Sequence, residues 1–199
     1  METLLSGMHI AILATDGFEQ AELTKPKAAL EQEGAITKIV SEQAGRIQGF
    51  HHADKADFFN VDLTLEEADH SDFDAVLLPG GVMNSDHIRS LPQAQKFVQG
   101  MQQEGKPIAV ICHGAWLLVS AGLVKGRTLT SWPSLQDDIR NAGGEWQDQE
   151  VIVDANWISS RKPDDIPAFN KAIVKTIGAY IKAGLKDSAD ENAVGIASS

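Results

Sequence analysis

Two adjacent residues, Cys112 and His113, have the side chains best suited to chemistry, and Cys112 is the only cysteine in the sequence. They stand where a strand-like apolar run, residues 107–112, gives way to a helix-like segment that begins at Gly114. Reactive groups gather at the carboxyl ends of strands in open α/β sheets, and a tight strand-to-helix turn can hold a nucleophile in a strained position. The N-terminus of the following helix would stabilise a thiolate, so we expect a lowered pKa for Cys112. The pattern predicts a nucleophile elbow.

The alternative for Cys112 is packing. Free cysteine is among the most buried residue types and often behaves as a small hydrophobe, and His113 could equally be a capping or hydrogen-bonded residue. Adjacent side chains at an elbow point apart, so we do not expect His113 to deprotonate Cys112 directly. No histidine follows His113 in the sequence. This excludes the hydrolase and amidotransferase triads in which the histidine comes later in the chain than the nucleophile.

Two further motifs could supply partners for the thiol. Gly80 and Gly81 end an apolar run, and their backbone N–H groups could form an oxyanion hole, although an ordinary glycine turn would have the same sequence. Glu19 and Glu22 stand three residues apart on one side of an incipient helix. In one interpretation both glutamates face the same edge of the sheet as the thiol. In the other they are solvated residues at the start of a helix, where the helix dipole favours negative charge.

No metal or cofactor is expected. His51 and His52 are adjacent, but no ligand spacing surrounds them, so a surface loop is the better interpretation.

Short runs rich in Ile, Val, Leu and Ala, each bounded by Gly, Pro or Asp, predict buried parallel strands. They cover residues 9–15, 35–41, 74–81 and 107–112. Helical patterns lie between them, one with Thr24 as N-cap, Pro26 in its first turn and Gly34 past its end, and another over residues 91–105. Thr64 and Glu67 have the spacing of a capping box. Further strands after Gly122 and a closing helix over residues 163–185 complete an α/β sandwich.

Composition limits the class of protein. The 199 residues predict a single domain, with a core of about residues 8–185 and a polar, disordered tail over 186–199. A net charge of −11 disfavours nucleic acid as a partner. One cysteine excludes an intramolecular disulfide and suits the reducing cytoplasm. The longest nearly apolar run, residues 108–124, contains polar residues and glycines, and the N-terminus has no secretory signal, so no membrane association is expected.

Several separated motifs occur together in an order that resembles one family. They are DGFEQAEL near the start, LPGG, VICHGAWLLVSAGLVKGRTLTSWPSLQDDIRNAGGEW and VIVDANWISSRKPDDI. From about residue 9 to residue 183 the sequence resembles the PfpI-like branch of the ThiJ/PfpI superfamily. The resemblance implies a flavodoxin-like three-layer sandwich with a mostly parallel sheet, which agrees with the pattern of strands and helices.

The resemblance also implies roles for individual residues. Cys112 would be the nucleophile and His113 the family's histidine, while Glu22 would hydrogen-bond the sulfur, with Glu19 as the second candidate. Trp132 corresponds to the aromatic residue near the pocket. An acid from a neighbouring subunit approaches the histidine in such proteins. The matching segment carries Asp86 where the best-known members have glutamate, and it is one residue longer.

The implied function is a stress-protective enzyme whose cysteine attacks carbonyls, as a deglycase, glyoxalase or hydrolase acting on reactive aldehydes or their protein adducts. One alternative is an intracellular cysteine peptidase whose site a neighbouring subunit completes. Others are a redox sensor or chaperone that uses Cys112 without turnover, and a domain that has kept the fold and lost the chemistry. The partners would be small carbonyl compounds or modified or unfolded protein, together with further copies of the chain in a dimer or hexamer. A glutamate bonded to the thiol should have a raised pKa, because the two groups share a proton.

Overall fold

The computed structural model describes the backbone of residues 3–196 and the side chains of residues 3–184. A seven-stranded sheet with the order β11-β12-β8-β7-β1-β3-β6 forms its centre. Only the β11–β12 pair is antiparallel, so the sheet is mostly parallel as predicted. Its strands are β1 (His9–Leu13), β3 (Ile36–Ser41), β6 (Leu63–Thr64), β7 (Ala75–Leu78), β8 (Ile108–Ile111), β11 (Val151–Asp154) and β12 (Trp157–Ser160).

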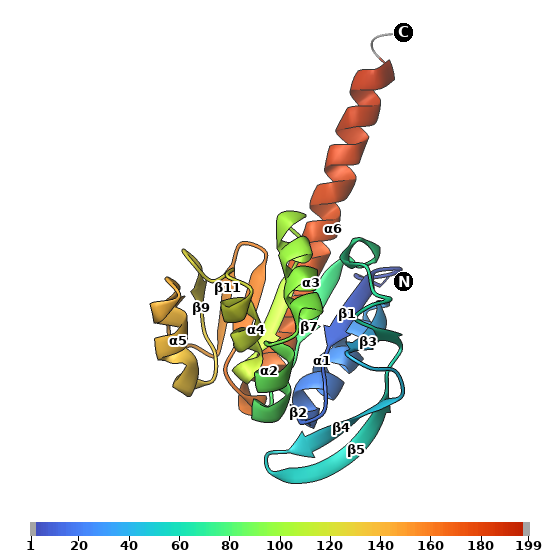
Figure 1. The fold of residues 1–199 in the computed structure, drawn as a ribbon. Helices are drawn as coiled ribbons and strands as arrows, with labels where there is room; N and C mark the ends of the chain where they lie inside the picture. The colour runs from blue at the N-terminus through green and yellow to red at the C-terminus, as the bar shows by residue number, and fades with distance from the viewer. Residues whose placement is uncertain (1–2, 197–199) are drawn as a thin grey trace.

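Helices cover both faces of this sheet, which makes three layers (Figure 1). On one face α1 (Gln20–Gln32) and α6 (Ile166–Ile196) pack against the sheet through residues such as Leu23 and Phe169. On the other face α3 (Pro92–Gln103) and α4 (Ala115–Ser120) contribute residues such as Phe97 and Leu118. The central strands β7 and β8 are buried along their whole length, which explains why they are continuous apolar runs. The predicted flavodoxin-like sandwich is confirmed.

Smaller elements complete the fold around the central sheet. Two further helices are α2 (Val82–Ile88) and α5 (Gln136–Asn141). The remaining strands are β2 (Phe18–Glu19), β4 (Arg46–His51) and β5 (Asp54–Asn60), which form one small sheet, and β9 (Thr128–Leu129) and β10 (Glu145–Trp146), which form another. The described residues also form short 3-10 helices, namely η1 (His70–Asp72), η2 (Cys112–Gly114), η3 (Pro133–Leu135) and η4 (Pro163–Asp165). The reciprocal hydrogen bonds of the predicted Thr64–Glu67 capping box are present, but they close a turn and no helix follows.

The start of α1 differs from the prediction. Thr24 is not an N-cap, because the helix already begins at Gln20 and the Thr24 hydroxyl donates to the Gln20 carbonyl at 2.9 Å. Pro26 consequently lies inside the helix instead of in its first turn. The pairing of β2 with β4 brings the chain to the helix start earlier than local capping signals indicate. This earlier start places Glu22 in the first turn of α1, where it is buried.

The end of the chain also differs. The closing helix is present from Ile166, but its backbone continues through Ile196, into the segment that composition predicts to be disordered. Residues 186–196 contain two alanines, one lysine and one glutamate beside poorer helix formers such as serine, asparagine and glycine, so composition alone does not explain the continuation of the helix. Residues 197–199 of the predicted tail lie outside the described residues. Among the described helices, none is both long and apolar enough to cross a membrane.

Candidate active site

Cys112 lies at a strained elbow directly after β8. Its φ of +62° is in the left-handed region, which non-glycine residues rarely adopt, and such strain persists only where the surrounding structure enforces it. The chain then turns through η2 into α4. Gly114 permits this turn, because a Cβ atom there would lie 2.6 Å from the Leu78 carbonyl oxygen at the end of β7. The elbow therefore presents the thiol at the carboxyl edge of the sheet.

Glu22 approaches the thiol from α1. Its side chain is fully buried, and its Oε2 accepts the Gly80 N–H at 2.8 Å. Its Oε1 is buried without a well-aligned hydrogen-bond partner among the described residues, and the carboxyl group interacts with the Cys112 thiol. Burial raises the pKa of Glu22 to about 8, with a smaller contribution in the same direction from the charge of Glu19. Glu22 is therefore a protonated, neutral acid at pH 7.

His113 also contacts the thiol, with 3.2 Å between its Nδ1 and the Cys112 Sγ. The prediction that these adjacent side chains point apart is wrong, because the sulfur and the ring nitrogen lie within hydrogen-bond distance of each other. Burial lowers the pKa of His113 to about 4, so the imidazole is neutral. Trp132 stacks on this ring and Trp116 packs edge-on against it, with centroids 5.8 and 5.3 Å away, which holds its orientation.

The thiol itself is not activated within a single chain. Burial raises the pKa of Cys112, and a charge on Glu22 would raise it further. The backbone N–H groups of His113 and Gly81 act in the opposite direction with smaller effect. The expected lowering of this pKa is not found, because desolvation of the buried thiolate is the largest effect on the Cys112 thiol and raises its pKa.

A cavity of about 380 Å³ opens onto the thiol. Its lining consists of Glu19, Glu22, His52, Ala53, Gly81, Val82, Cys112, His113, Trp132 and Pro163. His52 comes from the tight turn between β4 and β5, far from the elbow in sequence. Its backbone N–H donates to Glu19 Oε2 at 2.9 Å, and its φ is +56°. Glu19 thus anchors the hairpin turn at the cavity, and it is Glu22, not Glu19, that interacts with the thiol.

The sequence matches a known family. The DJ-1/PfpI family model matches residues 8–176. The chain belongs to this family. Deglycase TK1284 of Thermococcus kodakarensis is 43% identical over 170 residues, which are 85% of this chain and 99% of that protein. Protein/nucleic acid deglycase 2 of Escherichia coli is 37% identical over 171 residues, 85% of this chain and 98% of that one.

Solved structures of DJ-1/PfpI proteins share the fold. A two-domain protein from Anabaena variabilis with DJ-1/ThiJ/PfpI-like and ferritin-like domains superposes with a TM-score of 0.80 at 32% identity, over 86% of this chain and 48% of that chain. DJ-1 of Schizosaccharomyces pombe has a TM-score of 0.74 at 18% identity, over 88% of this chain and 97% of that one. The resemblance inferred from the motifs is confirmed, and the names of the curated relatives support deglycase- or hydrolase-type activity in general terms.

The backbone N–H groups of the two glycines in the predicted oxyanion hole have different partners in this DJ-1/PfpI protein. The Gly80 N–H is occupied by Glu22, so it is not free to bind an oxyanion. A Cβ atom at Gly80 would lie 2.5 Å from Glu22 Oε2 and 2.7 Å from the Cys112 Cβ, so glycine is needed here for close packing. Gly81 lines the cavity, and its N–H interacts with the sulfur.

Asp86 does not join the other predicted residues within the chain. It is exposed on α2 and lines a different cavity, together with His87 and Arg89. A role for Asp86 at the His113 of a neighbouring subunit remains a prediction.

The motifs did not reveal Asn84 as a positioning residue. Its side chain accepts the Thr15 N–H at 2.7 Å and donates to the Gly80 carbonyl at 2.9 Å, and it is fully buried. Asn84 thereby ties the end of β1 to the glycine loop. An asparagine in a short helical segment carries no local signal for this role, nor does His52 in a hairpin turn.

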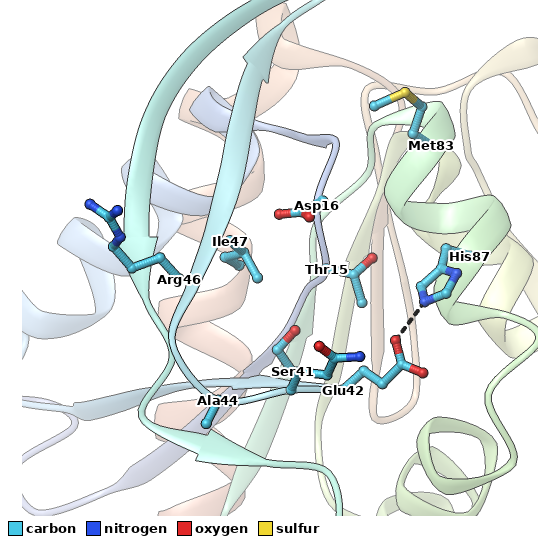
Figure 2. Close-up of a pocket in the computed structure, with 10 residues that line it drawn as sticks. Thr15, Asp16, Ser41, Glu42, Ala44, Arg46, Ile47, Met83 and His87 are labelled. Carbon is cyan, nitrogen blue, oxygen red and sulfur yellow. Dashed lines mark hydrogen bonds and ion pairs between the residues drawn. The ribbon is translucent and has the colours of Figure 1, made fainter.

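A second cavity of about 380 Å³ also involves α2 but does not contain Cys112 (Figure 2). It is lined by polar residues at the ends of β1 and β3 and by Met83 and His87, and His87 Nε2 lies 2.8 Å from Glu42 Oε2. None of the predicted site residues lines this cavity. Within the described part of the chain, no group of three or more His, Cys, Asp or Glu side chains could hold a metal ion.

Proposed function

We propose that the protein is a cysteine-dependent enzyme that attacks the carbonyl carbon of small reactive aldehydes or of their adducts on protein amines, as a deglycase or glyoxalase does. The observation that carries the proposal is the single thiol at a strained elbow in a cavity, with Glu22 and His113 both in contact with its sulfur. The deglycase names of relatives that are 43% and 37% identical support the same reaction class.

The protonation states favour addition of a neutral thiol over attack by a standing thiolate. The Cys112 sulfur would form a bond to the carbonyl carbon while its proton passes to His113 Nδ1, 3.2 Å away, and then to the carbonyl oxygen. The product is a hemithioacetal, so no net charge is created in the buried site. The proton on Glu22 would stabilise negative charge that develops on sulfur during the transfer.

The dimensions of the cavity favour small substrates or a single modified side chain. About 380 Å³ accommodates an aldehyde or the end of a lysine adduct, but not a folded protein segment. Trp132 supplies a partly exposed aromatic surface, and Glu19 holds the turn that carries His52.

We also propose that the enzyme is a homo-oligomer in which α2 of one subunit contacts its neighbour. Val82 and Met83 on this helix are each more than half exposed, and Val82 lines the Cys112 cavity. Exposed apolar side chains grouped beside a site are typical of an interface. Asp86 lies on the same short helix, so such a contact would carry it to the neighbouring subunit.

The test uses a methylglyoxal adduct of an amino-blocked lysine and measures release of the free lysine derivative. We expect the wild-type protein and His9→Ala to release it, because His9 is exposed at the opposite end of β1 from the site. Cys112→Ala should abolish release, and His113→Ala should reduce it by a factor on the order of a hundred or more, as expected for loss of a proton-transfer group.

Other outcomes discriminate between the alternatives. Cleavage of an unfolded casein substrate that depends on Cys112, without release of lysine, would favour the peptidase. No turnover of either substrate, together with oxidation of Cys112 by peroxide, would favour a redox sensor. Full activity of His113→Ala would refute the proton-transfer role of the imidazole.

A further inference from the structure

A groove of about 710 Å³ lies along α6 on the outer side of the α1–α6 layer. Small residues line it, including Ala29, Gly178 and Ala179, together with Val174. Leu4 forms one wall and is 40% exposed. Leu4 packs so closely on α6 that a Cβ atom at Gly178 would lie 2.8 Å from its Cγ. The groove is therefore a shallow, mostly apolar surface at which another helix could approach closely.

Three lysines of α6 also line this groove: Lys171, Lys175 and Lys182. Their spacing of four and seven residues places them on one side of the helix. None forms an ion pair with a carboxylate in the described part of the chain. The whole chain has a net charge of −11, so this row is a local concentration of positive charge on an acidic protein.

The last turns of α6 lie beyond the part of the chain that the family model matches. The DJ-1/PfpI family model ends at residue 176, whereas α6 continues to Ile196 and projects away from the rest of the molecule (Figure 1). The Thermococcus relative matches over 99% of its own length with 170 residues of this chain. A projecting helical end gains no stability from packing, and short isolated helices are marginal in water. Packing against the surface of a partner would stabilise this end of the helix.

We infer that the C-terminal end of α6, residues 186–196, docks in the α1–α6 groove of a second copy of this chain. The sequence there carries Asp187, Asp190 and Glu191, at spacings of three and one, so all three lie within about one turn of a helix. These acids complement the row of lysines in charge. Val194, three residues after Glu191, falls on the same side of the helix as these acids and would meet the apolar lining of the groove.

The geometry requires a second molecule. A continuous α6 carries its own end away from its own groove, so the end reaches only the groove of another copy. At a rise of about 1.5 Å per residue, the lysine row from 171 to 182 and the segment from 186 to 196 are both about 15 Å long. An antiparallel pair of α6 helices about a two-fold axis would therefore fill both grooves at once. This contact is separate from the α2 contact proposed for the active site.

Sedimentation velocity of the full chain across a concentration series tests the inference. We expect a chain that ends at residue 184 to have a dissociation constant for this association at least about ten-fold higher, as loss of one charged docking segment implies. Two charge-reversed proteins should show the same loss. One carries Lys171→Glu, Lys175→Glu and Lys182→Glu, and the other carries Asp187→Lys, Asp190→Lys and Glu191→Lys.

Mixing these two charge-reversed proteins distinguishes docking between chains from an effect within one chain. The acidic groove of the first then faces the basic tail of the second, so the mixture should recover association to within about three-fold of wild type. A control with Lys55→Glu, Lys96→Glu and Lys125→Glu has the same net charge on exposed positions elsewhere and should associate like wild type. Cys112 alkylation and the midpoint of urea unfolding should be unchanged in all variants.

Equal association of the full and shortened chains would overturn the inference, as would failure of the mixture to recover. Loss of association in the groove variant alone, with the tail variant like wild type, would also overturn it, since it would mean that the groove has another occupant.

Discussion

The charge state of Glu22 makes a quantitative prediction about stability. The perturbation is Glu22→Gln, which replaces the carboxyl by a neutral amide of similar shape that can still accept the Gly80 N–H. In the folded protein burial raises the pKa of Glu22 from 4.5 to about 8. An unfolded chain exposes the side chain and returns this pKa to its ordinary value.

The sign follows from proton linkage. Below pH 4.5 the carboxyl is protonated in both states and contributes no difference. Between pH 4.5 and 8 the unfolded state releases a proton that the folded state keeps, so wild-type stability falls relative to the amide variant by about 1.4 kcal/mol per pH unit. Glu22→Gln should therefore gain about 3 kcal/mol of unfolding free energy at pH 7 and about 4 kcal/mol at pH 8, relative to the difference at pH 4.

Urea unfolding followed by the fluorescence of the four tryptophans measures this difference at pH 4, 6, 7 and 8. Glu66→Gln is the matched control, because Glu66 is exposed and its replacement should give a difference that changes little with pH. A Glu22→Gln difference that stays constant from pH 4 to 8 would refute the reasoning, since it would mean that Glu22 is ionised in the folded protein.

Three further predictions concern the elbow and the cavity. Because burial raises the pKa of Cys112, the rate of its alkylation should still be rising at pH 9, as followed by mass spectrometry. A plateau below pH 8.5 would instead indicate a thiolate that is stabilised in the assembly. Gly114→Ala should cost about 1–3 kcal/mol in urea unfolding, because its Cβ would collide with the Leu78 carbonyl; an unchanged midpoint would show that the elbow can relax. Glu19→Ala removes the acceptor of the His52 N–H, so the hairpin turn should exchange its amide hydrogens faster, while equal exchange would mean that Glu19 does not anchor it.

Local sequence patterns were sufficient to predict the strands and the turn at the elbow, because backbone geometry decides where these form. The apolar runs before Gly80 and Cys112 are buried strands, and Gly114 allows the turn that raises the thiol. The start of α1 was misplaced because the predicted cap at Thr24 is a local signal, whereas the β2–β4 pairing that starts the helix at Gln20 joins segments about thirty residues apart. Asp86 illustrates the same limit, since its sequence position does not say which cavity it lines.

The sequence by itself determined the layered α/β architecture, the family and the position of the candidate nucleophile, because strand burial, turn glycines and motif order are properties of contiguous residues. Only the tertiary structure decided the chemistry of the site. It turned His113 toward the sulfur, occupied the Gly80 N–H with Glu22, and brought His52 to the cavity. It also raised the pKa of Cys112 and of Glu22. The cost of burying a charge depends on every group that excludes water from the site, and these groups come from distant parts of the chain.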